Sequence, residues 1–152
     1  METIKFSNPE QEPMQIKNLS EFDLNYFKEL EGDNGWLALG STDYTNSQYF
    51  TVYGEHNEKL GIVGVFDTEE EKNVTHTVVD PKYRGQGLAA KFKDEIMDKL
   101  NLPYITLTIS LDNIASIHAT EKLPGVKKVS DEQYEKDFYK VKYIYERSQK
   151  NN

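Results

Sequence analysis

The strongest chemical signal in the sequence is a short basic, glycine-rich segment between a predicted strand and a predicted helix. Residues 79–89 read Val-Asp-Pro-Lys-Tyr-Arg-Gly-Gln-Gly-Leu-Ala. The first amides of a helix have no intrahelical partner and carry partial positive charge, so an anion placed there gains several donors at once. Gly85 and Gly87 have no side chain to block that approach, and Arg84 adds a positive charge. The pattern predicts a binding site for a diphosphate.

Taken alone, the two glycines favour an ordinary strand-to-helix turn with a solvated Arg84. Two well-known phosphate-binding patterns do not match the segment. The dinucleotide fingerprint needs G-x-G-x-x-G, and the Walker A loop needs G-x-x-x-x-G-K followed by Ser or Thr. The neighbouring residues therefore have to decide which anion is bound.

The segment resembles motif A of the GNAT acetyltransferases, [RQ]-x-x-G-x-[GA], which Arg84, Gly87 and Ala89 match. The residues before it, 79–83, match the family as well. Downstream, residues 113–122 resemble motif B, an N-x-x-S-I-x-x-x-E-K helix that flanks the pantetheine arm of CoA. Motif B alone is equally consistent with an ordinary capped helix. Both motifs occur in the family's order with a strand between them, and the remaining strand order is also similar to the family's.

This resemblance implies an acetyl-CoA site. The amides of residues 84–89 would hold the diphosphate, and main-chain groups of two strand residues would pair with pantetheine. A backbone N–H near Val79 would polarise the thioester carbonyl, as in an oxyanion hole. In this family the strand that ends at residue 79 splays from the strand at 104–110, and the acetyl group lies in the gap. The implied CoA-binding residues are Val78, Val79, Arg84, Gly85, Gln86, Gly87, Leu88, Ala89, Asn113 and Ser116.

The resemblance also implies a reaction, in which a primary amine attacks acetyl-CoA directly. The acceptor would be a small-molecule amine, a peptide N-terminus or a lysine. An amine with a pKa of about 10.4 is protonated at pH 7, so a proton must leave it. Many members place Glu or His at the positions of Asn73 or Thr75, and Tyr at the position of Thr120. Asn73 and Thr75 are thus substrate-side positions that carry no base. The catalytic base and the catalytic acid stay unassigned, and ordered water is one route by which the amine proton could leave.

These missing groups leave a second reading open, a catalytically silent GNAT-fold module that binds acyl-CoA as a sensor or regulatory subunit. His76 and His118 are candidate proton acceptors. However, His76 alternates away from Asn73 and Thr75 on its predicted strand, and His118 is expected on the outer side of its helix. His56 falls in a predicted hairpin loop, where solvent contact is expected. Four aromatic residues could line an amine pocket or simply pack on the sheet: Trp36, Tyr44, Tyr49 and Tyr53.

The elements that must position this site alternate between strands and helices. Leu88, Phe92, Ile96 and Leu100 recur every four residues before Pro103, which predicts an amphipathic helix. Ser20 with Asp23 resembles a capping box and predicts a helix from Ser20 to near Gly32. We predict the first strand at Thr3–Phe6, before a loop with Pro9 and Pro13, and a short extended piece at 36–39. A hairpin is predicted over 49–53 and 59–66, and a second helix at 113–122. The remaining predicted strands are 73–79, 104–110, 126–129 and 138–145.

This element order predicts a mixed α/β fold (α/β with α+β character). Together with the resemblance, this implies a single-domain GNAT-like mixed central sheet of six to seven strands with helices on both faces and a splayed strand pair at the CoA site. The domain is expected over residues 1–147, followed by a polar tail at 148–152.

Size and composition limit the class of protein further. The 152 residues fit one domain, and the lack of cysteine excludes disulfides, a thiolate zinc site and a cysteine nucleophile, so no metal is expected. The formal charge of -8 disfavours nucleic acid as a partner. It either serves solubility or attracts a cationic amine, and charge alone does not choose.

Hydropathy bears on location. The longest apolar stretch, residues 60–66, is far shorter than the roughly 20 residues of a membrane-spanning helix. Residues 1–6 do not resemble a signal peptide. We therefore expect a cytoplasmic protein with no membrane partner, and a homodimer is among the expected assemblies.

Overall fold

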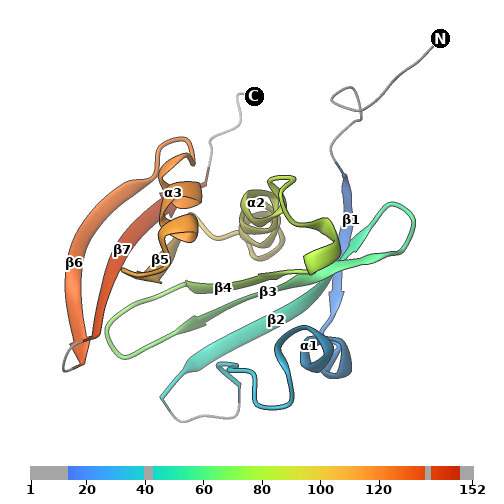
Figure 1. Ribbon diagram of the computed structural model, residues 1–152, viewed down its shortest axis with the longest axis horizontal. Helices are drawn as coiled ribbons and strands as arrows, with labels where there is room; N and C mark the ends of the chain where they lie inside the picture. Colours follow the sequence, from blue (N-terminus) through green and yellow to red (C-terminus); the bar gives the residue numbers. More distant parts are fainter. Residues whose placement is uncertain (1–13, 40–42, 136–137, 148–152) are drawn as a thin grey trace.

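The computed structural model describes residues 14–39, 43–135 and 138–147, and its strands form one seven-stranded sheet (Figure 1). The strand order is β1-β2-β3-β4-β5-β7-β6, and every neighbouring pair is antiparallel except β4 and β5, which are parallel. The predicted mixed sheet of six to seven strands is confirmed. The strands are β1 Ile16–Glu21, β2 Thr45–Gly54, β3 Lys59–Asp67, β4 Val74–Val79, β5 Tyr104–Ser110, β6 Lys127–Glu135 and β7 Phe138–Glu146.

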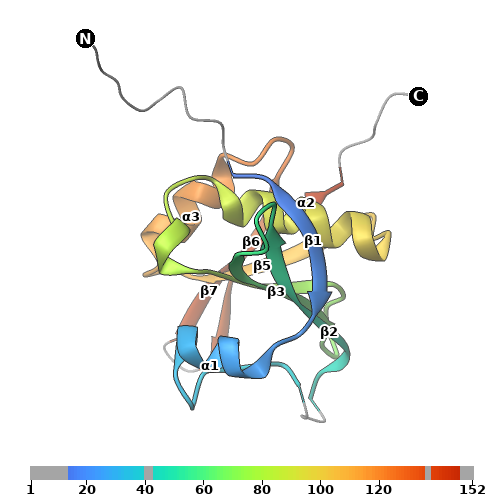
Figure 2. The same ribbon diagram turned by 90° about the vertical axis from the view of Figure 1, so that its right-hand side faces the viewer.

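Helices cover both faces of the sheet, as predicted. Helix α1, Leu24–Glu31, lies on one face, whereas α2, Leu88–Leu100, and α3, Ile114–Glu121, lie on the other (Figures 1 and 2). A short 3-10 turn, η1, spans Pro81–Tyr83 between β4 and α2. Among the described residues, no helix is both long and apolar enough to span a membrane.

One apolar cluster on each face holds the helices to the sheet. On the α2 side, Leu88, Phe92 and Ile96 are at most 1% exposed and pack against the inner strands. This is the helix that the four-residue spacing predicts, and it ends at Leu100, where Asn101 caps it with a left-handed φ of 54° before Pro103. On the α1 side, the buried members are Tyr26, Phe27, Ala38, Tyr49, Ile62, Phe66, Val74 and Val78.

The predicted start of the first helix was wrong. The helix begins at Leu24 instead of Ser20, because residues 16–21 pair with β2 and Ser20 lies opposite Thr51 in that ladder. Asp23 is the N-cap itself, and its carboxylate accepts the N–H of Tyr26 at 3.1 Å. The predicted end near Gly32 is confirmed, since Gly32 caps the helix with a φ of 86°.

The other predicted element boundaries differ less from those of the structure. The expected extended piece at 36–39 is not a strand, and β6 continues to Glu135 instead of ending at residue 129, because it pairs along β7 as a hairpin. The hairpin, the strands at 73–79 and 104–110, and the helices at 88–100 and 113–122 are found as predicted. Thr3–Phe6, Pro9, Pro13 and the 148–152 tail lie outside the described residues.

The parallel pair in the middle of the sheet separates almost at once. Strands β4 and β5 pair at Val74 and Thr106, where the Thr106 N–H donates to the carbonyl of Asn73 at 2.8 Å. By contrast, β4 pairs with β3 along its whole length. The expected splayed strand pair is therefore present, and the gap between the two strands opens toward the turn that follows Val79.

Candidate functional site

The turn between β4 and α2 presents free main-chain donors to solvent. Gly85 and Gly87 adopt left-handed φ angles of 85° and 76°, a region that glycine adopts at no steric cost. Gly87 is the N-cap of α2 and has no side-chain cap. Within the described part of the chain, no acceptor bonds the N–H groups of residues 85–90. We call the turn at residues 84–89 the anion seat.

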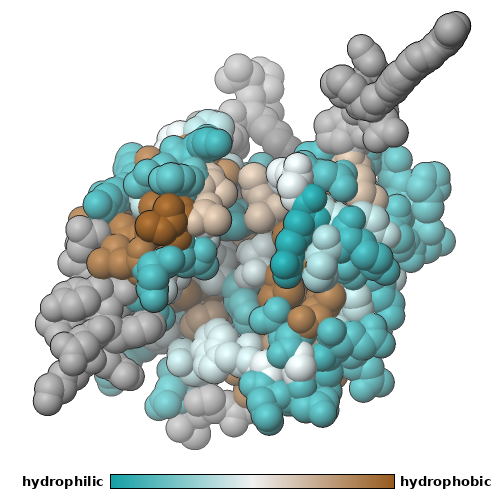
Figure 3. Space-filling model, viewed as in Figure 1, coloured by the Kyte–Doolittle hydropathy of each residue, from teal (hydrophilic) through white to brown (hydrophobic). Residues whose placement is uncertain are grey.

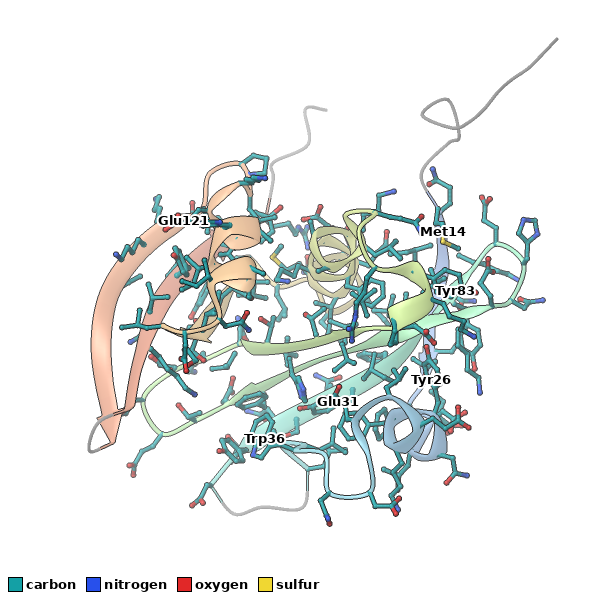
Figure 4. The ribbon with its side chains drawn as sticks, viewed as in Figure 1. Met14, Tyr26, Glu31, Trp36, Tyr83 and Glu121 are labelled. Carbon is teal, nitrogen blue, oxygen red and sulfur yellow. The ribbon has the colours of Figure 1, made fainter. Side chains whose placement is uncertain are left out.

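A buried carboxylate fixes the anion seat to the rest of the fold. Asp80 is 5% exposed and accepts the N–H of Lys82 at 2.9 Å. Its other oxygen accepts the hydroxyl of Tyr26 at 2.8 Å, with the carbonyl of Lys59 a second acceptor for that hydroxyl at 3.1 Å. Burial, and then the Asp80 carboxylate, raise the pKa of Tyr26, so the hydroxyl stays a donor. Tyr26 of α1 thus lies beneath the turn that carries Tyr83 (Figure 4).

Two cations border the anion seat in a chain of net charge -8. The Arg84 side chain folds back, and its Nε donates to the carbonyl of Val79 at 3.2 Å. Both Arg84 and Lys82 are exposed. Positive charge is therefore concentrated in the same turn as the free amides, and a diphosphate fits this donor set.

A slot of about 350 Å³ lies in the gap between β4 and β5, with α2 and α3 as its walls. The surface is hollowed between the part that carries α3, β5 and β7 and the part that carries β2–β4 (Figure 3). A second, more open hollow of about 510 Å³ at the β1–α1 junction includes Tyr53 but none of the motif residues. The slot is lined by Thr75, His76, Thr77, Val79, Ala89, Lys93, Leu107, Thr108, Ile109, Ser110, Asn113, Ser116 and Thr120.

Strand alternation decides which main-chain groups of β4 face the slot. The Asp80 N–H donates to Leu60 of β3 at 2.9 Å, so the main-chain groups of Val78 also point toward β3, where Val78 pairs with Ile62. Those of Thr77 and Val79 point into the gap. The Thr77 side chain adds a buried hydroxyl, Oγ1, that has no hydrogen-bond partner among the described residues.

The sequence-predicted CoA-binding residues are thus divided between three places. Four of them line the slot, namely Val79, Ala89, Asn113 and Ser116. The remainder of the 84–89 segment forms the exposed anion seat, apart from the side chain of Leu88, which is buried in the core. The side chain of Val78 is buried on the α1 face.

The two substrate-side positions are both engaged in holding β4 to β5. The amide of Asn73 donates to the carbonyl of Tyr104 at 3.0 Å, and the Thr75 hydroxyl lies 3.4 Å from the carbonyl of Thr106. Thr75 lines the slot, whereas Asn73 does not. Neither side chain is a base, so no proton acceptor stands at these positions.

A polar contact on the opposite face of β4 could not be foreseen from the sequence. The hydroxyl of Tyr49 lies 2.8 Å from Nδ1 of His76 and accepts the N–H of Ala38 at 3.2 Å. Gly64 lies between the two residues in the sheet, and a Cβ there would come within 2.5 Å of the Tyr49 ring. The missing side chain at Gly64 therefore lets Tyr49 reach across β3 to His76.

This contact bears on the role of His76. The Tyr49 hydroxyl and Nδ1 of His76 share one hydrogen bond, in which the donor depends on the tautomer of His76, while the Tyr49 oxygen also accepts from Ala38. Burial lowers the pKa of His76 to about 4, and burial raises that of Tyr49 to about 12. At neutral pH His76 is therefore uncharged and a poor base, which argues against the proton-acceptor role.

Aromatic side chains surround His76. The rings of Trp36 and Tyr44 lie with centroids 5.5 Å apart, and the Trp36 ring lies 5.3 Å from His76. Trp36 is 51% exposed, so it forms the open edge of this cluster (Figure 4). Tyr53 is placed elsewhere, at the β1–α1 hollow. His118 and His56 are both exposed, as expected for the outer side of a helix and a hairpin loop.

The low pKa of His76 predicts a loss of stability in acid. An unfolded histidine has a pKa of about 6.5, so between about pH 6.5 and pH 4 the unfolded chain binds a proton that the folded chain does not. We expect the free energy of unfolding to fall there by up to about 1.4 kcal/mol per pH unit from this residue. Urea unfolding across this range should show a smaller loss in His76→Phe, and equal losses in both proteins would contradict the assignment.

The comparisons with known proteins agree with the geometry of the site. Residues 41–146 match the family model described as "Acetyltransferase (GNAT) domain", which is more than half of the 152-residue chain. No curated protein matches the chain in sequence.

Solved structures share the fold at low sequence identity. A chimera of the Vibrio cholerae spermidine N-acetyltransferase SpeG and hSSAT has a TM-score of 0.64 at 15% identity, covering 89% of this chain and 96% of its own. The V. cholerae spermidine N-acetyltransferase in complex with CoA and spermine has a TM-score of 0.61 at 15% identity, covering 88% and 94%. The ribosomal-protein-S18-alanine N-acetyltransferase of Escherichia coli has a TM-score of 0.60 at 16% identity, covering 91% and 96%.

Proposed function

The chain belongs to the GNAT acetyltransferase family, and from this premise we propose that it transfers the acetyl group of acetyl-CoA to a primary amine. The observation that carries the proposal is the anion seat, whose free amides at 85–90 open beside the slot between β4 and β5. In this proposal residues 84–89 hold the diphosphate of CoA. Asn113 and Ser116, on the α3 wall of the slot, contact the pantetheine arm.

The main-chain groups of β4 have the remaining binding role. Thr77 and Val79 direct theirs into the gap, where the Val79 carbonyl also accepts from Arg84, so we assign pantetheine pairing to these two residues in preference to Val78. A backbone N–H in this stretch polarises the thioester carbonyl, because a fixed donor aimed at developing negative charge lowers the barrier. When bound, acetyl-CoA supplies the activated acyl group, and the residues of the slot supply position and exclude water.

The acceptor is proposed to approach from the α1 face, where the cluster around Trp36 is open. Aromatic faces attract cations, and the net charge of -8 attracts a cationic amine from a distance. Family neighbours include enzymes named for spermidine and for a ribosomal-protein alanine, so both a polyamine and a peptide N-terminus belong in the test. A lysine side chain and other small-molecule amines are the remaining acceptor classes.

The experiment is a thiol-release assay with acetyl-CoA and a panel of polyamines, aminoglycosides and peptides. We expect amine-dependent release of free CoA, with an acetylated amine in the same mixture by mass spectrometry. Calorimetric titration with CoA runs beside it. Binding of CoA without release for any amine would support the sensor alternative, which the lack of a base at Asn73 and Thr75 favours. Failure to bind CoA at all would reject both.

A further inference from the structure

Lys93 is a cation in the wall of the slot, and no part of the binding scheme uses it. It follows Ala89 by one helical turn on α2, and both residues line the slot. Its Nζ makes a long hydrogen bond of 3.4 Å to the carbonyl of Ala89. Burial lowers the pKa of Lys93 to about 8, opposed by the neighbouring Asp94. Near neutral pH the group is still mostly charged, and it can give up its proton readily.

In the described structure Lys93 makes no ion pair, although the adjacent Asp94 carboxylate favours its charged form. No carboxylate is among the described residues that line the slot, and the ring of His76 packs on the other face of β4 against Tyr49 and Trp36. Asp94, next along α2, is exposed and accepts the hydroxyl of Tyr145 at 2.8 Å. Lys93 is half-buried, and a charge largely withdrawn from water costs free energy unless it meets an opposite charge, so a ligand that brings negative charge into the slot would be stabilised there.

The other polar groups of the slot are neutral. The buried hydroxyl of Thr77 has no partner in the described structure, and Thr120, 5% exposed, faces the slot from α3. Thr120 occupies the position at which many family members have a tyrosine. A threonine hydroxyl can donate a hydrogen bond but does not release its proton near neutral pH. Among the slot residues described, Lys93 is therefore the side chain with a proton to give.

We propose that Lys93 holds, and then protonates, the sulfur of CoA as the thioester is cleaved. This inference rests on the proposed acetyl transfer. In that reaction the amine nitrogen forms a bond to the acyl carbon, the carbon–sulfur bond breaks, and its electron pair stays on sulfur. Lys93 gives its proton to that sulfur and is reprotonated from solvent, which also receives the proton lost by the amine. The products are the amide and CoA with a free thiol.

The pKa of Lys93 is close to that of a free thiol. A free thiol has a pKa of about 8.5, close to that of Lys93, and transfer between groups of similar pKa near the working pH is efficient. The Lys93 charge also stabilises the departing sulfur before the proton moves. In this way a lysine on α2 would do what a tyrosine on α3 does in many relatives.

The test compares CoA with desulfo-CoA, which lacks the sulfur, by calorimetric titration of the full chain. We expect wild type to bind CoA about tenfold more tightly than desulfo-CoA at a pH near 8, because one charge-assisted interaction is lost. In Lys93→Met the ratio should fall to about one. The ultraviolet band of the thiolate should appear on CoA bound to wild type and not to Lys93→Met.

The variant is chosen to keep the fold. Methionine has a similar length and keeps an apolar stem where the lysine stem packs, so a large loss of stability is not expected. Lys93→Gln provides a second variant should Lys93→Met not fold. Lys99→Met is the matched control, because Lys99 is exposed on the same helix outside the slot and its Nζ lies over the Phe50 ring instead. In turnover, Lys93→Met should lower kcat about hundredfold with little change in acceptor KM.

The outcomes separate this inference from the proposed function. If wild type binds neither CoA nor desulfo-CoA, the acetyl-CoA assignment itself fails. If both bind and their ratio is the same in wild type and Lys93→Met, only the role of Lys93 is rejected. If succinyl-CoA binds far more tightly than CoA in wild type and not in Lys93→Met, the lysine recognises a carboxylate on the acyl group, and the sulfur role is overturned.

Discussion

A Gly87→Val variant is expected to lose at least about hundredfold in affinity for CoA while it remains folded. Nothing lies within 4 Å of a Cβ built at Gly87, so the new side chain enters the open space above the anion seat. A diphosphate must occupy that space to reach the free amides. Each charge-assisted hydrogen bond contributes about 1.5–3 kcal/mol, so losing two of them accounts for the expected change. Calorimetric titration with CoA measures it.

The control variant introduces the same backbone strain at a position outside the proposed CoA site. Gly125 has a φ of 77°, against 76° at Gly87, also has open space at its Cβ, and lies outside the slot. A β-branched residue in this region of φ costs about 1–3 kcal/mol, so Gly87→Val and Gly125→Val should be destabilised alike. Only the first should lose CoA. Wild-type affinity in Gly87→Val would mean that the diphosphate does not lie at the anion seat.

The features of this fold that local sequence determines were predictable. The four-residue spacing of Leu88, Phe92 and Ile96 predicts α2, and Pro103 limits its end, because both signals act within a few residues. The glycines at 85 and 87 predict the anion seat for the same reason, since left-handed φ angles and unpaired helix amides are properties of one turn.

The features that depend on pairing between distant strands were not predictable. Ser20 and Asp23 have the spacing of a capping box, but Ser20 is instead held in β1 by its position opposite Thr51 on β2. The reach of Tyr49 to His76 depends on Gly64, which only the register of β2, β3 and β4 brings between them. Local sequence contains no signal for either arrangement.

Lys93 is an intermediate case. It follows Ala89 by four residues, so the helical period places both on one wall, and the sequence could have indicated this. The helical period does not show that this wall of α2 faces a gap between two strands. That gap follows from the single pairing of Val74 with Thr106, beyond which β4 and β5 separate. A lysine that would read as a solvated surface charge therefore lies in the slot.

The largest expected effect on stability comes from Phe92 of α2, because the packing of α2 against β3 supports the slot. Phe92 is 0% exposed, and its ring lies against β3 where Gly61 has no side chain; a Cβ at Gly61 would come within 2.7 Å of that ring. Phe92→Ala should lower the free energy of unfolding by about 3–5 kcal/mol, measured by urea denaturation, out of the roughly 5–15 kcal/mol that domains have. The loss should exceed that of Phe92→Leu, which leaves a smaller cavity. A loss below about 1 kcal/mol would mean that Phe92 does not hold α2 against β3. Because β3 carries β4 along its whole length, the variant should also weaken CoA binding at temperatures where it is still folded.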